Sequence, residues 1–283
     1  MTLQNFKTQF YSEIKNILEK EELESYFFWT IENVLNLKKI DVFTNSNYII
    51  SSENSSKLFE IIERIKNYEP IQYIFNEAYF YGHQFYVNKN VLIPRQETEQ
   101  LVEIIENQLN KSQKYEILDI CTGSGCIAIS LSKIFKNATI SAIDIDKKAL
   151  EIAQKNNILL ETNVNFEQKN ILTDTLAQKY DVIVSNPPYV RNLEKIEIKP
   201  NVLDFEPHLA LFVEDENPLI FYDKIAKLAL ENLKSDGWLF FEINQYLGKE
   251  TKELVQKIGF SNVEIIKDFR GNDRIIKGQY INN

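Results

Sequence analysis

The chain has 283 residues, 44% of them apolar, which is enough for a sizeable core in one large domain or two smaller ones. Its net charge of −9 argues against broad contact with nucleic-acid phosphates, which needs a basic face, although a local basic patch stays open. There is no apolar signal core at the N-terminus, no apolar run of membrane-spanning length and only two cysteines, so we expect a protein of the reducing cytoplasm.

Residues 1–70 are predicted to form a small helical domain. Apolar residues recur there at steps of three and four, which is the period of a helix with one buried face. They are Leu3, Phe6, Phe10, Ile14 and Ile17, then Leu23, Phe27, Ile31 and Val34, and finally Leu58, Ile61, Ile62 and Ile65. The third helix is expected to be capped within "NSS" (54–56) and to stop before Pro70.

Residues 71–94 differ in pattern from the helical part. The stretch "AYFYGHQFYVNKNVLI" (78–93) alternates and contains Gly82, which predicts a β-hairpin. We therefore expect a hairpin linker between the helical domain and a larger domain that spans residues 95–283.

In the larger domain, strand-like and helix-like segments alternate. Strands are predicted at 115–120, 138–144, 163–168, 180–186 and 237–243, with helices at 126–135, 147–157, 218–233 and 247–260. This alternation predicts an α/β fold with a mostly parallel sheet and helices on both faces. The last two strands, 262–268 and 273–280, have no helix between them and predict an antiparallel hairpin at one edge.

The turn "CTGSG" (121–125) joins the first strand of this domain to a helix. Gly123 and Gly125 let the backbone turn tightly and approach a ligand closely. The turn lies at the carboxyl end of a strand, where open α/β sheets bind ligands. A purely structural turn is the alternative, because such turns alone are weak evidence.

Asp144 ends the next strand, 19 residues after Gly125. An acidic side chain there can accept hydrogen bonds from both hydroxyls of a ribose, whereas Asp146 fits the N-cap of the following helix. The chain has neither a P-loop nor the G-x-G-x-x-G spacing of a dinucleotide fold. This favours a nucleoside ligand without a pyrophosphate, such as S-adenosylmethionine.

The stretch "VSNPPYV" (184–190) ends another strand at the same edge of the sheet. A planar amide is a poor nucleophile, so an enzyme that methylates it must hold it in line with the methyl group. Asn186 Oδ1 and the Pro187 carbonyl can each accept one N–H of such a group, and Tyr189 can pack on its planar face. This is transfer by orientation and electrostatics without a strong base. A Pro-Pro turn without chemistry is the alternative.

Other chemistries have little support. Cys121 and Cys126 have no partners at metal-ligand spacing, so they are interpreted as packing residues and no metal site is expected. His83 and His208 lack a paired serine or cysteine motif, which argues against a catalytic triad.

From about residue 70 to 280 the sequence resembles the release-factor glutamine methyltransferases (PrmC/HemK). The resemblance rests on "LIPRQETE", "ILDICTGSGCIAI", "AIDID", "DVIVSNPPYV", "FEPHLAL" and "GNDR", which fall in family order and spacing. "NPPY" alone would also fit DNA adenine methyltransferases, whereas "IPRQETE" and "FEPHLAL" are more specific. The resemblance implies an N-terminal helical substrate-docking domain and a Rossmann-like methyltransferase domain.

The resemblance also implies roles for individual residues. The substrate would be the glutamine of the Gly-Gly-Gln loop of class-1 peptide release factors, methylated on its side-chain amide nitrogen with S-adenosylmethionine as cofactor. The residues expected to bind the cofactor are Cys121, Thr122, Gly123, Ser124, Gly125, Asp144, Asn170, Ile171 and Asn186. The residues expected to clamp the glutamine are Asn186, Pro187, Pro188 and Tyr189, with Asn186, Pro187 and Tyr189 as the catalytic group.

Three positions depart from the commonest family pattern. Cys121 stands where glycine is usual, and Asn170 and Ile171 replace an aspartate followed by an aromatic residue. Asn170 would accept the adenine amino hydrogen more weakly than a carboxylate, and Ile171 would cover the ring without stacking on it.

Two other functions stay open at this point. Adenine methylation of DNA uses a similar geometry on a flipped base, but the acidic charge disfavours it. A non-catalytic adenosylmethionine-binding module that docks on translation factors would not need the clamp. We expect a monomer that acts on release factors, with no membrane contact and no nucleic-acid substrate.

Overall fold

The computed structural model describes residues 1–282, which form two compact units. Unit 1 contains residues 1–76 and a short return segment, residues 199–205. Unit 2 contains residues 77–198 and the chain from Glu206 onward. Each unit has its own apolar core.

Unit 1 is helical, as the sequence predicts. Its helices are α1 (Leu3–Ile14), α2 (Lys20–Leu35), α3 (Lys39–Thr44), α4 (Ser52–Lys66), α5 (Ile71–Phe75) and α9 (Pro200–Leu203). The predicted apolar residues of α1, α2 and α4 lie in or against one core, in which the rings of Phe6, Phe10 and Phe27 contact one another. The predicted cap of α4 is wrong by three residues, because Ser51 accepts the hydrogen bond from Asn54 N, at 3.2 Å.

Unit 2 opens with the expected hairpin. Strands β1 (Glu77–Phe80) and β2 (His83–Tyr86) pair antiparallel, and the two turn residues have positive φ, 48° at Tyr81 and 74° at Gly82. Such a turn matches the twist of paired strands, and glycine adopts it without strain. Helix α6 (Gln96–Gln108) follows and was not among the predicted helices, although Thr98, Leu101, Val102 and Ile105 are buried at helical spacing.

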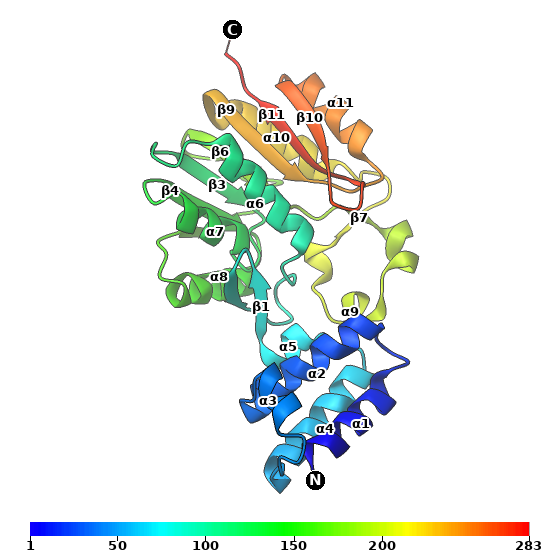
Figure 1. The fold of residues 1–283 in the computed structure, drawn as a ribbon. Coiled ribbons are helices and arrows are strands. Elements are labelled where there is room, and N and C mark those ends of the chain that lie inside the picture. Colours follow the sequence, from blue (N-terminus) through cyan, green and yellow to red (C-terminus); the bar gives the residue numbers. More distant parts are fainter. Residues whose placement is uncertain (283) are drawn as a thin grey trace. The chain divides into compact units, whose positions relative to one another are not determined.

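A seven-stranded sheet forms the centre of unit 2 (Figure 1). Its strands are β3 (Glu116–Ile120), β4 (Thr139–Asp144), β5 (Asn165–Gln168), β6 (Tyr180–Ser185), β9 (Leu233–Glu242), β10 (Ser261–Lys267) and β11 (Asp273–Gln279). The strand order is β10-β11-β9-β6-β3-β4-β5. All neighbours from β5 to β9 are parallel, and β11 and β10 are antiparallel, so the predicted fold class is confirmed.

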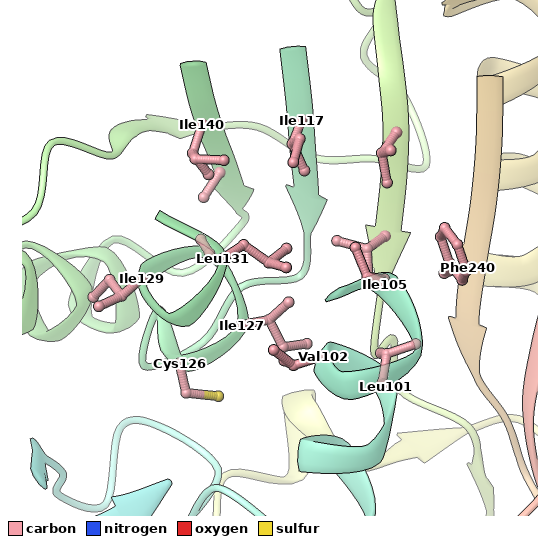
Figure 2. Close-up of a cluster of buried hydrophobic side chains, with 14 of the residues drawn as sticks. Leu101, Val102, Ile105, Ile117, Cys126, Ile127, Ile129, Leu131, Ile140 and Phe240 are labelled. Atoms are coloured by element: carbon pink, nitrogen blue, oxygen red, sulfur yellow. The ribbon is translucent and has the colours of Figure 1, made fainter. Parts of the chain in front are cut away.

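Helices cover both faces of this sheet. They are α6, α7 (Cys126–Ile134), α8 (Lys147–Leu159), α10 (Ile220–Asn232) and α11 (Gly248–Ile258). Figure 2 shows side chains of α6 and α7 packed with residues of β3, β4 and β9 on one face. Adjacent strand residues such as Ile117 and Leu118 belong to different clusters, one on each face. The strands are therefore apolar on both sides, as is usual for buried parallel strands.

Strands β4 and β5 lie on one side of β3 in the strand order. The chain then returns and places β6 on the other side of β3. Ligands of open α/β sheets bind at such a switch point, outside the carboxyl ends of the strands. Short elements follow β6: β7 (Val190–Arg191), the 3₁₀ helices η1 (Asn192–Glu197) and η2 (His208–Ala210), and β8 (Phe212–Val213), which pairs parallel with β7. In residues 1–282 no helix is long and apolar enough to cross a membrane.

The Ser51 cap yields a stability prediction. Ser51→Ala removes the acceptor for Asn54 N and should lower the free energy of unfolding by about 1 kcal/mol. Ser52→Ala is the matched control, because Ser52 is exposed and already inside the helix. Urea denaturation of both variants measures the difference, and equal stabilities would contradict the assignment of the cap.

Candidate active site

Three segments meet at the carboxyl edge of the sheet. In the parallel register, Ile120 of β3 lies opposite Ile143 of β4 and Ser185 of β6. The glycine turn, Asp144 and Asn186 follow directly after these aligned residues. The pairing therefore brings together side chains that are up to 65 positions apart in the sequence.

One pocket of unit 2 is lined by most of the predicted site residues. These are Cys121, Thr122, Gly123, Ser124, Asp144, Asn170, Ile171, Asn186 and Pro188. Gly125, Pro187 and Tyr189 lie beside it but are not part of its lining. Gly125 is the N-cap of α7, Pro187 is buried, and the Tyr189 hydroxyl is directed to a buried carboxylate.

The two glycines of the turn have different surroundings. A Cβ at Gly125 would come within 3.0 Å of Ile129 Cδ1 and 3.2 Å of Ala153 Cβ, so this glycine allows α7 to pack against α8. A Cβ at Gly123 would meet no atom within 4 Å, and the residue has φ of 55°. Gly123 thus exposes its backbone to the pocket, where a ligand can approach closely.

Asp144 ties the end of β4 to the glycine turn. Its Oδ2 accepts from Gly123 N at 2.8 Å, and its Oδ1 accepts from Asp146 N at 2.9 Å. Burial raises the pKa of Asp144, while the two backbone hydrogen bonds oppose that shift. Each carboxylate oxygen can accept a further hydrogen bond, which suits a ligand with two neighbouring hydroxyls. Asp146 caps α8 by accepting from Lys148 N at 2.8 Å, as predicted.

Asp119 holds the glycine turn through a hydrogen bond with Thr122. It was not among the predicted site residues. It is fully buried, and its Oδ2 accepts from the Thr122 hydroxyl at 2.6 Å. Burial raises the pKa of Asp119 to about 7, and the nearby Asp144 carboxylate adds to that shift. Its position in "LDICTGSG" offered a signal, since an acidic residue inside an apolar strand needs a specific partner.

Asn170 and Ile171 form the wall of the pocket beyond β5. Asn170 Oδ1 accepts from Leu172 N at 3.1 Å, and Asn170 N donates to Asp174 Oδ2 at 2.9 Å. The Asn170 oxygen is therefore partly engaged in its own turn. Ile171 is buried and presents an apolar surface.

A further part of the lining comes from the segments 90–98 and 207–210, which overlap the motifs "LIPRQETE" (92–99) and "FEPHLAL" (205–211); no site role was assigned to either motif. The lining residues of these segments are Asn90, Val91, Leu92, Pro94, Arg95, Thr98, Pro207, Leu209 and Ala210. Buried Glu206 joins the two motifs by accepting from Ile93 N at 3.1 Å and by pairing with Arg95. The residues that Glu206 contacts are more than 100 positions away in the sequence. The spacing of residues within each motif therefore could not reveal that the two motifs meet at the pocket.

The "NPPY" residues are held by a third buried acid, Glu242. Asn186 Nδ2 donates to Thr98 Oγ1 at 3.3 Å, and the Thr98 hydroxyl donates to Glu242 Oε2 at 2.6 Å. The Tyr189 hydroxyl donates to Glu242 Oε1 at 2.9 Å. Among residues 1–282 there is no cluster of three or more side chains suited to a metal ion.

Comparison with known proteins agrees with this geometry. A family model described as PrmC N-terminal domain matches residues 8–75, and one described as Methyltransferase small domain matches residues 95–203. A release factor glutamine methyltransferase of Flavobacterium psychrophilum is 51% identical over 281 residues, which cover 98% of this chain and 99% of the relative. The chain belongs to the release factor glutamine methyltransferase family. The resemblance seen in the sequence is thereby confirmed.

A further relative supports the family, and two solved structures support the fold. A release factor glutamine methyltransferase of Bacteroides thetaiotaomicron is 42% identical, with 93% of this chain and 95% of the relative covered. A methyltransferase from Pyrococcus furiosus has a TM-score of 0.52 at 19% identity, over 81% of this chain and all of that one. The hMettl16 catalytic domain has a TM-score of 0.55 at 16% identity, over 82% of this chain and 84% of that one. These two structures share the fold.

In this member of the family, Cys121 has a left-handed backbone with φ of 62°, which favours glycine. Cys121→Gly should therefore be more stable than Cys121→Ala by up to about 1 kcal/mol, because both lose the thiol but only alanine keeps the strain. Thermal and urea denaturation of the two variants measure this. Equal stability, or a more stable alanine variant, would show that the backbone there is unstrained.

Proposed function

We propose that this protein transfers a methyl group from S-adenosylmethionine to the side-chain amide nitrogen of the glutamine in the Gly-Gly-Gln loop of class-1 peptide release factors. One observation carries the proposal: Asn186 of "NPPY" lines the same pocket as Gly123 and Asp144. A nucleoside site and an acceptor for a planar amide thus share one space. Relatives at 51% and 42% identity bear the name of this activity.

The pocket suits a nucleoside cofactor without phosphates. Among residues 1–282, two basic side chains line the pocket, and both form ion pairs: Arg95 with Glu206 and Lys169 with Glu167. A pyrophosphate would lack a free cation there. Gly123 leaves room for close approach, Asp144 offers acceptors for the ribose hydroxyls, and Ile171 offers an apolar cover for the base. When bound, S-adenosylmethionine supplies an electrophilic methyl group on a positively charged sulfur.

The residues of the chain bind and orient the methyl acceptor. Asn186 Oδ1 accepts one N–H of the glutamine amide and the Pro187 carbonyl accepts the other, which draws electron density toward the amide nitrogen. The two prolines restrict the backbone that carries these acceptors. We assign Pro188 and Tyr189 to the same clamp, with Tyr189 beside the planar amide. Orientation in a fixed site lowers the barrier to transfer.

Release factors fit this site better than DNA does. The charge of −9 disfavours a phosphate backbone and tolerates a basic protein loop. Glycines beside the target glutamine let a protein loop enter without side-chain clashes. We propose that the protein acts as a monomer in the cytoplasm, where release factors work, and that its N-terminal helical domain (residues 1–70) docks the substrate.

A direct assay tests the proposal. Purified protein is incubated with labelled S-adenosylmethionine and either a release factor or duplex DNA, and release-factor peptides are analysed by mass spectrometry. We expect one added methyl group on the glutamine of the Gly-Gly-Gln peptide and no label on DNA. Label on DNA alone would replace the proposal by the adenine alternative, and binding without transfer to either would indicate a non-catalytic module.

Asp144→Ala should weaken the binding of S-adenosylmethionine by about 2–4 kcal/mol, because two charge-assisted hydrogen bonds to the ribose are lost. Isothermal titration calorimetry measures the affinity. Asp144→Asn has the same shape and serves as a control for a distorted turn. Thermal melting of both variants shows whether the fold is kept, so that a loss of ligand contacts can be told from a distorted turn. Unchanged affinity in a folded Asp144→Ala protein would place the ribose elsewhere.

Asn186→Ala should lower kcat for release factor about a hundredfold or more, as the loss of one preorganised polar group in a buried site does. Folding should change little, because Asn186 follows the end of β6. Asn186→Asp keeps the shape and one acceptor but adds a negative charge, so it should also be impaired. Methyl transfer at saturating substrate measures kcat, and a wild-type rate in a folded alanine variant would reduce "NPPY" to a turn.

A further inference from the structure

The "NPPY" segment and the start of α6 converge on one buried carboxylate, that of Glu242. Glu242 is the last residue of β9 and is 2% exposed. The preceding residue, Phe241, pairs with Ser185 of β6, so Glu242 lies level with Asn186 at the carboxyl edge of the sheet. Thr98 of α6 and Tyr189 of "NPPY" thus meet at a side chain that is itself outside the pocket lining.

The hydrogen bonds around Glu242 have a direction that follows from its chemistry. An ionised carboxylate only accepts, so the Thr98 and Tyr189 hydroxyls must both donate to it. The Thr98 oxygen is then left as an acceptor. The group that faces it, at 3.3 Å, is Asn186 Nδ2, which donates.

This direction determines how the Asn186 amide is turned. With Nδ2 on Thr98, Oδ1 is the end of the amide that remains for a ligand, and no residue among 1–282 donates a hydrogen bond to it. A glutamine amide nitrogen carries only donors, so it needs an oxygen there. The opposite rotamer would place an NH₂ group against the NH₂ of the substrate.

We propose that Glu242 is a positioning residue that, through Thr98, turns the Asn186 amide oxygen toward the methyl acceptor and, through Tyr189, anchors the other end of "NPPY". The inference rests on the proposed function of the site and assigns Glu242 no contact with cofactor or substrate. It also gives the threonine of "IPRQETE" a role, since Thr98 is the link between carboxylate and amide.

Burial raises the pKa of Glu242, while the hydrogen bonds from the Thr98 and Tyr189 hydroxyls and the charge of Arg274 favour its ionised form. Arg274 provides the positive charge, and its Nε also donates to Asp268 Oδ2 at 3.2 Å. Glu97 is the nearby acidic group that opposes ionisation. Both carboxylate oxygens of Glu242 have a hydroxyl donor, so the buried charge is solvated by the protein.

A purely structural role for Glu242 is the alternative, and two pairs of variants separate the readings. Glu242→Gln keeps the shape but presents an NH₂ group, which reverses the direction of one hydrogen bond. Thr98→Val keeps the shape but removes the hydroxyl, whereas Thr98→Ser keeps the hydroxyl and is the conservative rescue. Tyr222→Phe is the matched control, because among residues 1–282 the Tyr222 hydroxyl bonds only the main-chain groups of Glu242 and Asn244.

The readouts are kcat and KM for release-factor methylation, the Kd for S-adenosylmethionine and the melting temperature. We expect Glu242→Gln and Thr98→Val to lower kcat about tenfold or more, the effect of one lost orienting hydrogen bond, with the Kd changed less than about threefold. Thr98→Ser and Tyr222→Phe should retain kcat within about threefold. The Glu242→Gln, Thr98→Val double variant should be no slower than the slower single variant, because both break the same chain.

The outcomes distinguish this inference from the proposed function. If the wild-type protein does not methylate release factor, the proposed function fails. If the wild type is active and Thr98→Val keeps wild-type kcat, or the two single effects multiply in the double variant, Glu242 does not act through Thr98 and the inference is wrong. Should Glu242→Gln not fold, the comparison of Thr98→Val with Thr98→Ser decides alone, and equal impairment of the two would also overturn the inference.

Discussion

In-register parallel pairing of β4, β3 and β6 is the constraint on which the site depends. Because Ile120, Ile143 and Ser185 lie side by side, the chain leaves all three strands at one level. A slip of one residue would move a strand end by about 3.3 Å and exchange the two faces of that strand. The different apolar clusters on the two faces oppose such a slip, since each alternate side chain packs against its own set of helices.

Three buried carboxylates hold the segments that this register brings together. Asp119 accepts from the Thr122 hydroxyl in the glycine turn, Glu206 accepts from Ile93 N and pairs with Arg95, and Glu242 accepts from two hydroxyls. A buried acid without donors is costly, so each one requires its partners to stay in place. The loops around the pocket are thereby fixed before any ligand binds, which suits a reaction that proceeds by orientation.

The same network changes the interpretation of "NPPY". The sequence motif predicts Tyr189 on the face of the substrate amide, and in the structure the Tyr189 hydroxyl donates to Glu242 Oε1. Burial and the neighbouring Glu242 carboxylate raise the pKa of Tyr189, which keeps the phenol protonated as a donor. The motif is therefore held at its first and last residues, with the two rigid prolines between them.

Much of this arrangement could be predicted because it depends on short-range patterns. The period of apolar residues indicated α1, α2 and α4 of unit 1, and the alternation of strands and helices indicated the parallel sheet. Asp146 was identified as a cap from its place before a helix. Helix α6 carried the same kind of signal but was not singled out, and the cap of α4 was misplaced because several serine and asparagine residues adjoin that helix.

By itself, the sequence determined the fold class, the order of the elements and the family, and it identified the glycine turn, Asp144 and "NPPY" as parts of the site, but not the motifs "LIPRQETE" and "FEPHLAL". Only the tertiary structure decided which side chains of distant segments form hydrogen bonds and ion pairs with one another. Thr98 and Glu242 are 144 positions apart, and Arg95 and Glu206 are 111 apart. Local propensity and periodicity act over a few residues and contain no information on such partners. The partner of a buried acid is decided when the sheet assembles and brings donors from distant segments to a carboxylate that has lost its water.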